Sequence, residues 1–237
     1  MATQLETVNN VLRRLREDTV STINETVYSQ LIAQFVNDAK ADMEEIAYDW
    51  SAYITEIDTT VLADGTTTYD LTDTNDRSYM IRQQEDRTPM AFDITTNDRH
   101  QLYDIPYKEL LETRAGAAAV DVAKPQIFSI ISDSDGRGFS LELLYGADNA
   151  RPWRTYWYVP QAELAIDDTD SSTEILLPAR PIQLRAYYYA SEDRGEAQGV
   201  ALDLLWRRSE NAIGAAIEID QQVNKPYENN IRNDESL

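Results

Sequence analysis

The sequence predicts an α+β fold with helices at both ends of the chain and an antiparallel β region between them. Near both ends, apolar residues recur every three or four positions, which is the period of a helix that is buried on one side. Between about residues 54 and 177 the apolar period shortens to two, and turn residues separate short segments. We therefore expect N-terminal helices over 1–53, a β-rich region over 54–177, C-terminal helices over 178–223 that complete a helical bundle, and an extended tail over 224–237.

Two capping boxes predict where the N-terminal helices begin. Thr3-Gln4-Leu5-Glu6 places a threonine three residues before a glutamate, so each side chain can bond a backbone N–H of the first turn. A first helix near 4–16 follows. Thr22-Ile23-Asn24-Glu25 repeats the pattern and predicts the start of a longer amphipathic helix that continues to about residue 52.

Short segments rich in threonine, tyrosine and isoleucine predict the strands of the middle region. Residues 54–62 and 66–71 flank Asp64-Gly65, which favours a hairpin turn, and 162–166 and 174–177 suggest a second hairpin. A short helix is expected near 106–114, before the low-complexity stretch 115–125. Further strands are expected at 78–84, 90–95, 126–132, 139–145 and 155–160.

Proline and glycine mark the expected start and end of the first C-terminal helix. Pro181 suits a first helical turn and Gly195 suits a helix end, which predicts a helix over about 180–194. A last helix is expected over about 198–223. The segment from Asn224 onward is polar and has too few apolar residues to form a core alone.

Both C-terminal helices are apolar over an unusually wide arc. On the last helix one sector holds Leu204, Ala212 and Ile219, and a second sector extends the arc through Trp206 and Ile213. Two explanations fit: a central helix covered on both sides by its own domain, or a helix with one sector on its own core and the other on a neighbouring subunit. The second explanation predicts that the second sectors form the subunit interface. Its residues are Leu184, Tyr187, Tyr188, Leu202, Trp206, Ile213 and Ile217.

Composition excludes several classes of function. The chain of 237 residues carries 42 acidic and 21 basic residues, a formal charge of −21, which repels nucleic acid phosphates and anionic membranes. It has no cysteine and one histidine, so thiolate chemistry is absent and only His100 offers an imidazole. No apolar run approaches the roughly 20 residues that cross a bilayer, and residues 1–10 do not resemble a signal peptide, so we expect a soluble, unexported protein with no membrane partner.

The motifs that suggest chemistry are incomplete. Residues 132–136, Ser-Asp-Ser-Asp-Gly, resemble a calcium loop, but glycine comes two positions early and Leu144 stands where a bidentate glutamate belongs, which favours a simple turn. Asp167, Asp168 and Asp170 lie beside Thr169, Ser171 and Ser172, a composition that favours a solvated hairpin tip over a cation site. His100 lacks a serine nucleophile or second imidazole, so we expect no catalytic, metal or cofactor site, and no enzyme.

The stretch RPWRTYWYVP, residues 151–160, offers the best case for a ligand platform. Its rings, between Trp153 and Tyr158, could stack on sugars or bases. In a strand, however, Trp153 and Trp157 share one face with Thr155, while Tyr156 and Tyr158 share the other, as in a sheet covered on both sides. Core packing is favoured; a carbohydrate- or receptor-binding tail module is the alternative function.

One stretch carries a family resemblance. The progression EILLPARPIQLRAYYYASEDRGE, followed by the helix LDLLWRRSENAIGAAIEIDQQV and a polar tail, resembles the C-terminal half of the head-to-tail adaptor (connector) proteins of short-tailed bacteriophages, the tail tubular protein A group. The N-terminal order of a short helix, a long amphipathic helix ending in YDWSAY, and strands agrees with this family.

The resemblance implies a structural virion protein of the neck and tail region, assembled in the host cytoplasm. Twelve copies would form a homo-oligomeric ring that joins the portal protein at the head to the tail nozzle or tube, with DNA passing through its channel without sequence-specific binding. The acidic composition suits such a channel, since a negative lining repels the duplex. The resemblance also implies that the tail contacts the portal, through Asn224, Lys225, Pro226, Tyr227, Ile231 and Arg232.

Overall fold

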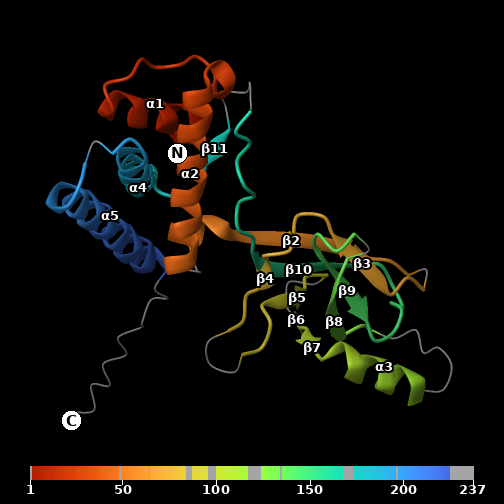
Figure 1. Cartoon of the computed structure of the whole chain (residues 1–237). Coiled ribbons are helices and arrows are strands. Elements are labelled where there is room, and N and C mark those ends of the chain that lie inside the picture. The colour runs from red at the N-terminus through yellow and green to blue at the C-terminus, as the bar shows by residue number, and fades with distance from the viewer. Residues whose placement is uncertain are drawn as a thin grey trace, which may run out of the picture. The chain divides into compact units, whose positions relative to one another are not determined.

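The computed structural model has an α+β fold, as the sequence predicts (Figure 1). It describes residues 2–47, 50–63, 65–83, 87–95, 100–116, 124–133, 135–167, 173–195 and 197–224. The chain divides into two compact units. The first comprises Met1–Ala52 with Glu163–Leu237 and the second comprises Tyr53–Ala162, so residues 163–177 group with the helices and not with the β region.

The first unit begins with a helix whose start the sequence predicts correctly. Thr3 Oγ1 accepts the backbone N–H of Glu6, and the Thr3 N–H donates to the Glu6 carboxylate, both at 3.1 Å. This capping box opens α1 (Gln4–Arg14), which ends in two arginines that suit the negative end of the helix dipole.

The start predicted for the second helix is wrong by one turn. Thr22 makes no capping bond, and residues Ile23–Glu25 form a short 3₁₀ turn. The cap is Thr26, whose Oγ1 accepts the Ser29 N–H at 2.9 Å at the start of α2 (Val27–Ile46). The α-helix ends before residue 52, and Trp50 lies buried beyond it, with its indole N–H donating to the Met43 carbonyl at 3.2 Å.

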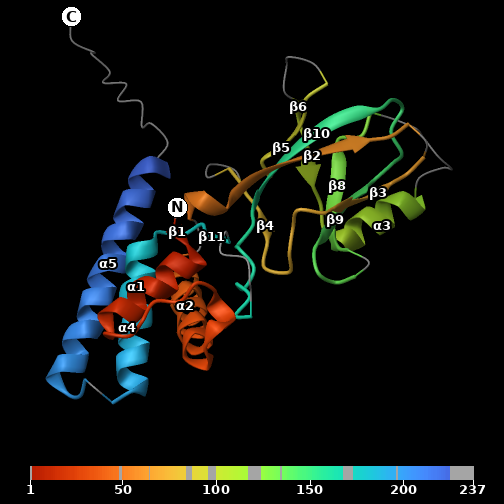
Figure 2. The same ribbon diagram turned by 90° about the horizontal axis from the view of Figure 1, so that it is seen from above.

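The remaining elements of the first unit come from the C-terminal part of the chain. Helices α4 (Ala179–Asp193) and α5 (Val200–Asn224) agree with the predicted ranges, and α1, α2 and α4 pack on one another while α5 packs on α4 (Figure 2). The predicted hairpin of 162–166 and 174–177 does not form. Instead β11 (Glu174–Ile175) pairs with β1 (Ala2–Thr3) from the N-terminus. Buried members of this core are Val8, Val11, Leu12, Ile32, Val36, Met43, Ile182, Ala186 and Ile213.

The second unit contains two sheets that share one core. One sheet has the order β2-β10-β5-β6, with β4 also on β10, and the other has the order β3-β9-β8-β7. Their core includes Phe128, Leu141, Leu143, Trp153 and Trp157. The strands are β2 (Ile54–Val61), β3 (Thr68–Leu71), β4 (Tyr79–Met80), β5 (Ala91–Asp93), β6 (His100–Gln101), β7 (Tyr103–Asp104), β8 (Ile127–Ser132), β9 (Phe139–Leu143) and β10 (Arg151–Tyr158).

Within the second unit, strand pairing differs from the sequence prediction in two places. The hairpin predicted between 54–62 and 66–71 does not form, because β2 pairs along its whole length with β10 and β3 pairs with β9. The β region is also not wholly antiparallel, since β7 pairs parallel to β8. The predicted short helix is present as α3 (Tyr107–Gly116), against β8. The Arg114 guanidinium fixes α3 by pairing with Glu142 at 2.8 Å and donating to the Leu144 carbonyl at 3.2 Å.

Candidate interaction surface

Helices α4 and α5 carry the candidate surface, and glycines define the connection between them. Gly195 has a φ of +65° directly after the α4 cap residue, and Gly199 has a φ of +56° directly before α5. Both values lie in the left-handed region that glycine adopts without strain. The connection reverses the chain so that α5 packs along α4.

A buried arginine lies between the helices of the first unit. Arg185 on α4 is 1% exposed, and its guanidinium carbon lies 3.7 Å from the ring centroid of Trp206 on α5. Arg185 forms ion pairs with Glu210 of α5 and, at 3.5 Å, with Asp42 of α2. One side chain therefore ties three helices together, and the low dielectric around it strengthens these attractions.

The consecutive tyrosines extend this polar network. The Tyr189 hydroxyl donates a hydrogen bond to Asp42, and burial together with this carboxylate raises the pKa of Tyr189. The Tyr188 ring meets the Trp206 ring edge to face, with centroids 5.1 Å apart. Burial and the nearby Glu192 carboxylate raise the pKa of Tyr188. Both phenols therefore stay neutral hydrogen-bonding groups, and Tyr188 and Trp206 cover each other within one chain.

The predicted subunit-interface residues occupy mixed environments. Leu184 and Ile213 are buried, at 5% and 2% exposure, and Trp206 is 38% exposed. The other four, Tyr187, Tyr188, Leu202 and Ile217, are half-buried. Of these residues the structure brings Tyr188 and Trp206 into direct contact.

On α5 the two apolar sectors do not divide into one buried and one exposed face, as the subunit-interface explanation predicts. The sector predicted to face a neighbour includes Ile213, which is part of the chain's own core, and Trp206, which packs over Arg185. The sector assigned to the core includes Leu204 and Ile219, which are 61% and 65% exposed. Trp206 remains 38% exposed although its ring lies over the Arg185 guanidinium, so one residue contacts both the chain's own interior and its surface.

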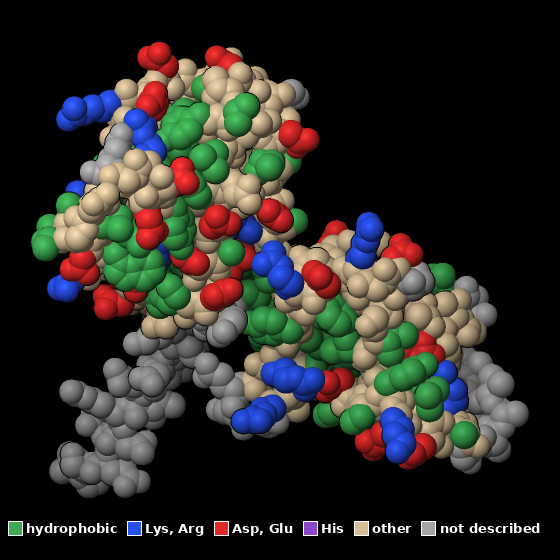
Figure 3. All heavy atoms as spheres, in the orientation of Figure 1, with side chains coloured by type: hydrophobic (Ala, Val, Ile, Leu, Met, Phe, Trp, Pro, Cys, Tyr) green, Lys and Arg blue, Asp and Glu red, His purple; other side chains and the backbone are tan. Residues whose placement is uncertain are grey.

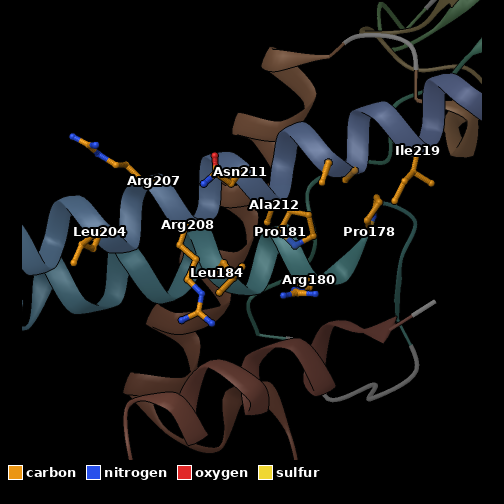
Figure 4. Close-up of a pocket in the computed structure, with 12 residues that line it drawn as sticks. Pro178, Arg180, Pro181, Leu184, Leu204, Arg207, Arg208, Asn211, Ala212 and Ile219 are labelled. Atoms are coloured by element: carbon orange, nitrogen blue, oxygen red, sulfur yellow. The ribbon is translucent and has the colours of Figure 1, made fainter.

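The exposed sector of α5 forms one wall of an apolar groove against α4 (Figure 4). The groove has a volume of about 680 Å³. Figure 3 shows hydrophobic side chains gathered on the surface in the region of α5. The lining residues are Pro178, Arg180, Pro181, Leu184, Leu204, Arg207, Arg208, Asn211, Ala212, Ala215, Ala216 and Ile219.

Three arginines border this groove. Arg207 pairs with Asp203 one turn earlier on α5, at 2.9 Å. The side chains of Arg180 and Arg208 form no ion pair or hydrogen bond with any other described residue. In Figure 4 their side chains project to one side of the helix pair, whereas that of Arg207 projects to the other. Two available positive charges thus flank an apolar surface in a chain with a twofold excess of acidic residues.

The aromatic stretch of β10 does not form an exposed platform. Trp153, Thr155 and Trp157 are each 0% exposed and face the core of the second unit, as the strand alternation predicts. Trp157 stacks on Phe139 with centroids 5.6 Å apart, and its indole N–H donates to Thr155 Oγ1 at 2.9 Å. On the other face, Arg154 pairs with Asp58 at 2.7 Å. These tryptophans are core residues, so their rings are not open to a sugar or base.

The motifs that suggest chemistry in the sequence lie apart from one another in the described residues. No group of three or more histidine or acidic side chains in the described ranges is arranged to hold a metal ion. Residues 132–136 begin the turn between β8 and β9, in which the Arg137 N–H donates to Asp133 Oδ1 at 3.0 Å; Ser134 lies outside the described residues. His100 is exposed at the start of β6. Asp168 and Asp170 lie outside the described residues.

Of the predicted portal contacts, Asn224 is the last residue of α5. The others lie outside the described residues: Lys225, Pro226, Tyr227, Ile231 and Arg232.

Among the described helices none is both long enough and apolar enough to cross a membrane. The groove between α4 and α5 is the candidate functional surface in the part of the chain that the structure describes. No protein-family model and no curated protein sequence matches the chain. The choice of this surface therefore depends on the geometry alone.

Proposed function

We propose that this chain is a structural virion protein, a head-to-tail adaptor that forms a ring between the portal of a short-tailed bacteriophage and its tail nozzle or tube. The observation that carries the proposal is the exposed apolar sector of α5. Leu204, Ile219 and Val200 are 61%, 65% and 77% exposed on one helix. A contiguous apolar surface bordered by polar residues is typical of a protein–protein interface.

The charge distribution supports an assembly that encloses DNA without binding its sequence. A formal charge of −21 opposes contact with phosphates, which suits a channel through which the duplex slides. The same charge opposes association of the copies with one another. We expect the free protein to be monomeric and to form the twelve-copy ring on a portal, which holds the copies at high local concentration.

The tail after α5 is the proposed portal contact in this function. Residues 225–237 are mostly polar and follow α5 in the sequence, as in the adaptor family that the sequence resembles. Coupled folding and binding lets such a segment contact a partner over a large surface.

Electron microscopy of the protein mixed with its portal protein tests the proposal. Rings stacked on the portal are expected. A chain lacking residues 224–237 should retain the circular dichroism and melting temperature of the full chain but bind the portal more weakly. Portal particles without an added ring would contradict the proposal. Unimpaired capture of the truncated chain would instead remove only the portal-contact role of the tail. A glycan array tests the alternative, a carbohydrate-binding tail module, by an independent readout.

A further inference from the structure

The chain passes between its two units twice, and hydrogen bonds hold the backbone close to both crossings. The first crossing lies between Ala52 and Tyr53, and the second lies between Ala162 and Glu163. Two units joined by short backbone segments can turn relative to each other when a few residues absorb the change in dihedral angles. The bonds on each side of the crossings therefore indicate which residues can change.

At the first crossing, the helical unit holds the chain as far as Ser51. The Asp220 carboxylate of α5 accepts hydrogen bonds from the Ser51 backbone N–H, at 3.0 Å, and from the Ser51 hydroxyl. The preceding residue, Trp50, is 1% exposed and donates from its indole to the Met43 carbonyl of α2. Both attachments lie within the first unit, so the chain is fixed to that unit up to this point.

The β unit holds the other side of the first crossing at Tyr53. The Tyr53 carbonyl accepts the Val159 N–H at 2.8 Å, and the buried Tyr53 ring meets the Tyr158 ring edge to face, with centroids 5.7 Å apart. Between these fixed points lies Ala52, exposed at the centre of one turn of 3₁₀ helix (Ser51–Tyr53). Short 3₁₀ turns are common as connectors, and their hydrogen bonds have poorer geometry than those of an α-helix. Ala52 is thus the residue at which the first crossing can bend.

At the second crossing, the β unit holds the chain as far as Gln161. Asn75 Nδ2 donates to the Pro160 carbonyl at 2.7 Å, and the Arg77 guanidinium donates to the Gln161 carbonyl at 2.6 Å. Both bonds join a side chain to the backbone of the segment that follows β10. They therefore restrain the direction of this segment until it leaves the second unit.

The helical unit holds the chain again from Leu164. Asn37 of α2, 6% exposed, donates to the Leu164 carbonyl at 2.7 Å and accepts the Leu164 N–H at 3.1 Å. A buried amide that bonds both backbone groups of one residue fixes the orientation of that residue. The two residues before it, Ala162 and Glu163, are exposed and form no hydrogen bond with another described residue.

We propose that the two units turn relative to each other about a hinge that consists of Ala52 in the first crossing and Ala162 with Glu163 in the second. All three residues are exposed, so a change in their dihedral angles disturbs no packed side chain. Each hydrogen bond that flanks the hinge lies within one unit and persists in every orientation. The hinge belongs to the free chain and does not depend on the proposed function. In an assembly, it would let one unit keep its contacts while the other reorients.

Distances between spin labels test the hinge by double electron–electron resonance. Because the chain has no cysteine, introduced cysteines are its only labelling sites. The pair Val27→Cys and Glu112→Cys spans the two units; Val27→Cys with Arg207→Cys, and Glu112→Cys with Thr60→Cys, each lie within one unit. All four residues are exposed, so the labels should not disturb folding, which circular dichroism checks. The cross-unit distribution should be more than about twofold wider than either within-unit distribution.

Substitutions locate the hinge. Ala162→Gly adds backbone freedom and should widen the cross-unit distribution, while Ala162→Pro removes it and should narrow the distribution. Asp220→Ala releases Ser51 and should also widen the distribution. The matched control is Asp203→Ala, which removes an exposed carboxylate from the same helix and should leave the width unchanged. The within-unit distributions should be the same in every variant.

A cross-unit distribution as narrow as the within-unit distributions would overturn the inference. Equal cross-unit widths in the two Ala162 variants would overturn it as well, since the second crossing would then not bend at this residue. If Asp220→Ala keeps the width of wild type, Ser51 does not limit the hinge and the role of Ala52 is wrong. Portal binding does not enter the measurement, so none of these outcomes bears on the proposed function.

Discussion

The Arg185 guanidinium of α4 lies 3.7 Å from the ring centroid of Trp206 on α5, and the Tyr188 ring meets that tryptophan edge to face, with centroids 5.1 Å apart. This contact joins the two C-terminal helices through a buried positive charge. The groove residues Leu204 and Ile219 lie outside this contact and are 61% and 65% exposed.

Replacing Trp206 should destabilise the chain even in the absence of any partner. Trp206→Ala removes a cation–π contact and an edge-to-face contact, and we expect a loss of about 1.5–3 kcal/mol in the free energy of unfolding. Trp206→Phe should lose less. Charged residues at both Tyr188 and Trp206 should destabilise it further. Urea denaturation measures these effects, and unchanged unfolding curves would mean that the two rings serve only a neighbouring subunit.

Arg185 should be more sensitive to truncation than to an apolar replacement of similar size. Arg185→Ala leaves a cavity and removes the partner of Asp42 and Glu210, so we expect a loss of about 3 kcal/mol, whereas Arg185→Met fills the space and should lose less than about 1.5 kcal/mol. The matched control is Arg207→Met, on a side chain 71% exposed that pairs with Asp203, with an expected effect below about 1 kcal/mol. If the Arg185 and Arg207 variants lose the same free energy of unfolding in chemical denaturation, Arg185 is not a buried ion-pair partner that stabilises the helices.

Asp93 should make stability depend on pH in the acidic range. Burial disfavours its carboxylate, but two hydrogen bonds from Thr95 and the charges of Lys124 and Arg151 outweigh this effect, so the pKa of Asp93 lies below its ordinary value. A lowered pKa in the folded state contributes stability above the unfolded value of about 3.9 and loses it as pH falls through the folded value.

Asp93→Asn should therefore lower the free energy of unfolding at neutral pH by about 1–3 kcal/mol, with the difference from wild type shrinking below about pH 4. Denaturation curves between these two pH values measure the change. Asp135→Asn, in the exposed turn between β8 and β9, is the control. A difference that stays constant across the acidic range would show that the titration of Asp93 is not linked to folding.

The helix caps offer a matched pair of threonines. Thr26→Ala removes the acceptor for the Ser29 N–H and should cost about 1 kcal/mol. Thr22→Ala, four residues earlier, removes no capping bond and should change stability by less than about 0.5 kcal/mol. Melting temperatures compare the two, and the reverse ranking would place the helix start at the earlier threonine.

Salt should promote association of the free protein. With a formal charge of −21 per copy, screening relieves long-range repulsion more than it weakens the few short-range pairs at a contact. Light scattering should detect monomers at low salt and larger species as salt increases. A stable ring at low salt without portal would contradict the proposal that the ring forms only on a portal.

Local sequence features were sufficient for most helices and for the interior of the β region. The Thr3 capping box, Pro181 and Gly195 define α1 and α4, because caps and backbone restrictions act within a few residues. The alternation of Trp153, Thr155 and Trp157 likewise predicted a buried strand face, since successive side chains of a strand point to opposite sides.

Tertiary structure decided the strand partners and the orientation of α5. The Asp64-Gly65 turn signal was overridden because β2 gains a full-length pairing with β10, and β11 finds its partner in β1 at the far end of the chain. No local pattern records such distant pairings. Both apolar sectors of α5 look suited to burial in the sequence. The packing of α5 on α4 decides between individual residues: it buries Ile213 and places Trp206 over Arg185, while Leu204 and Ile219 stay exposed.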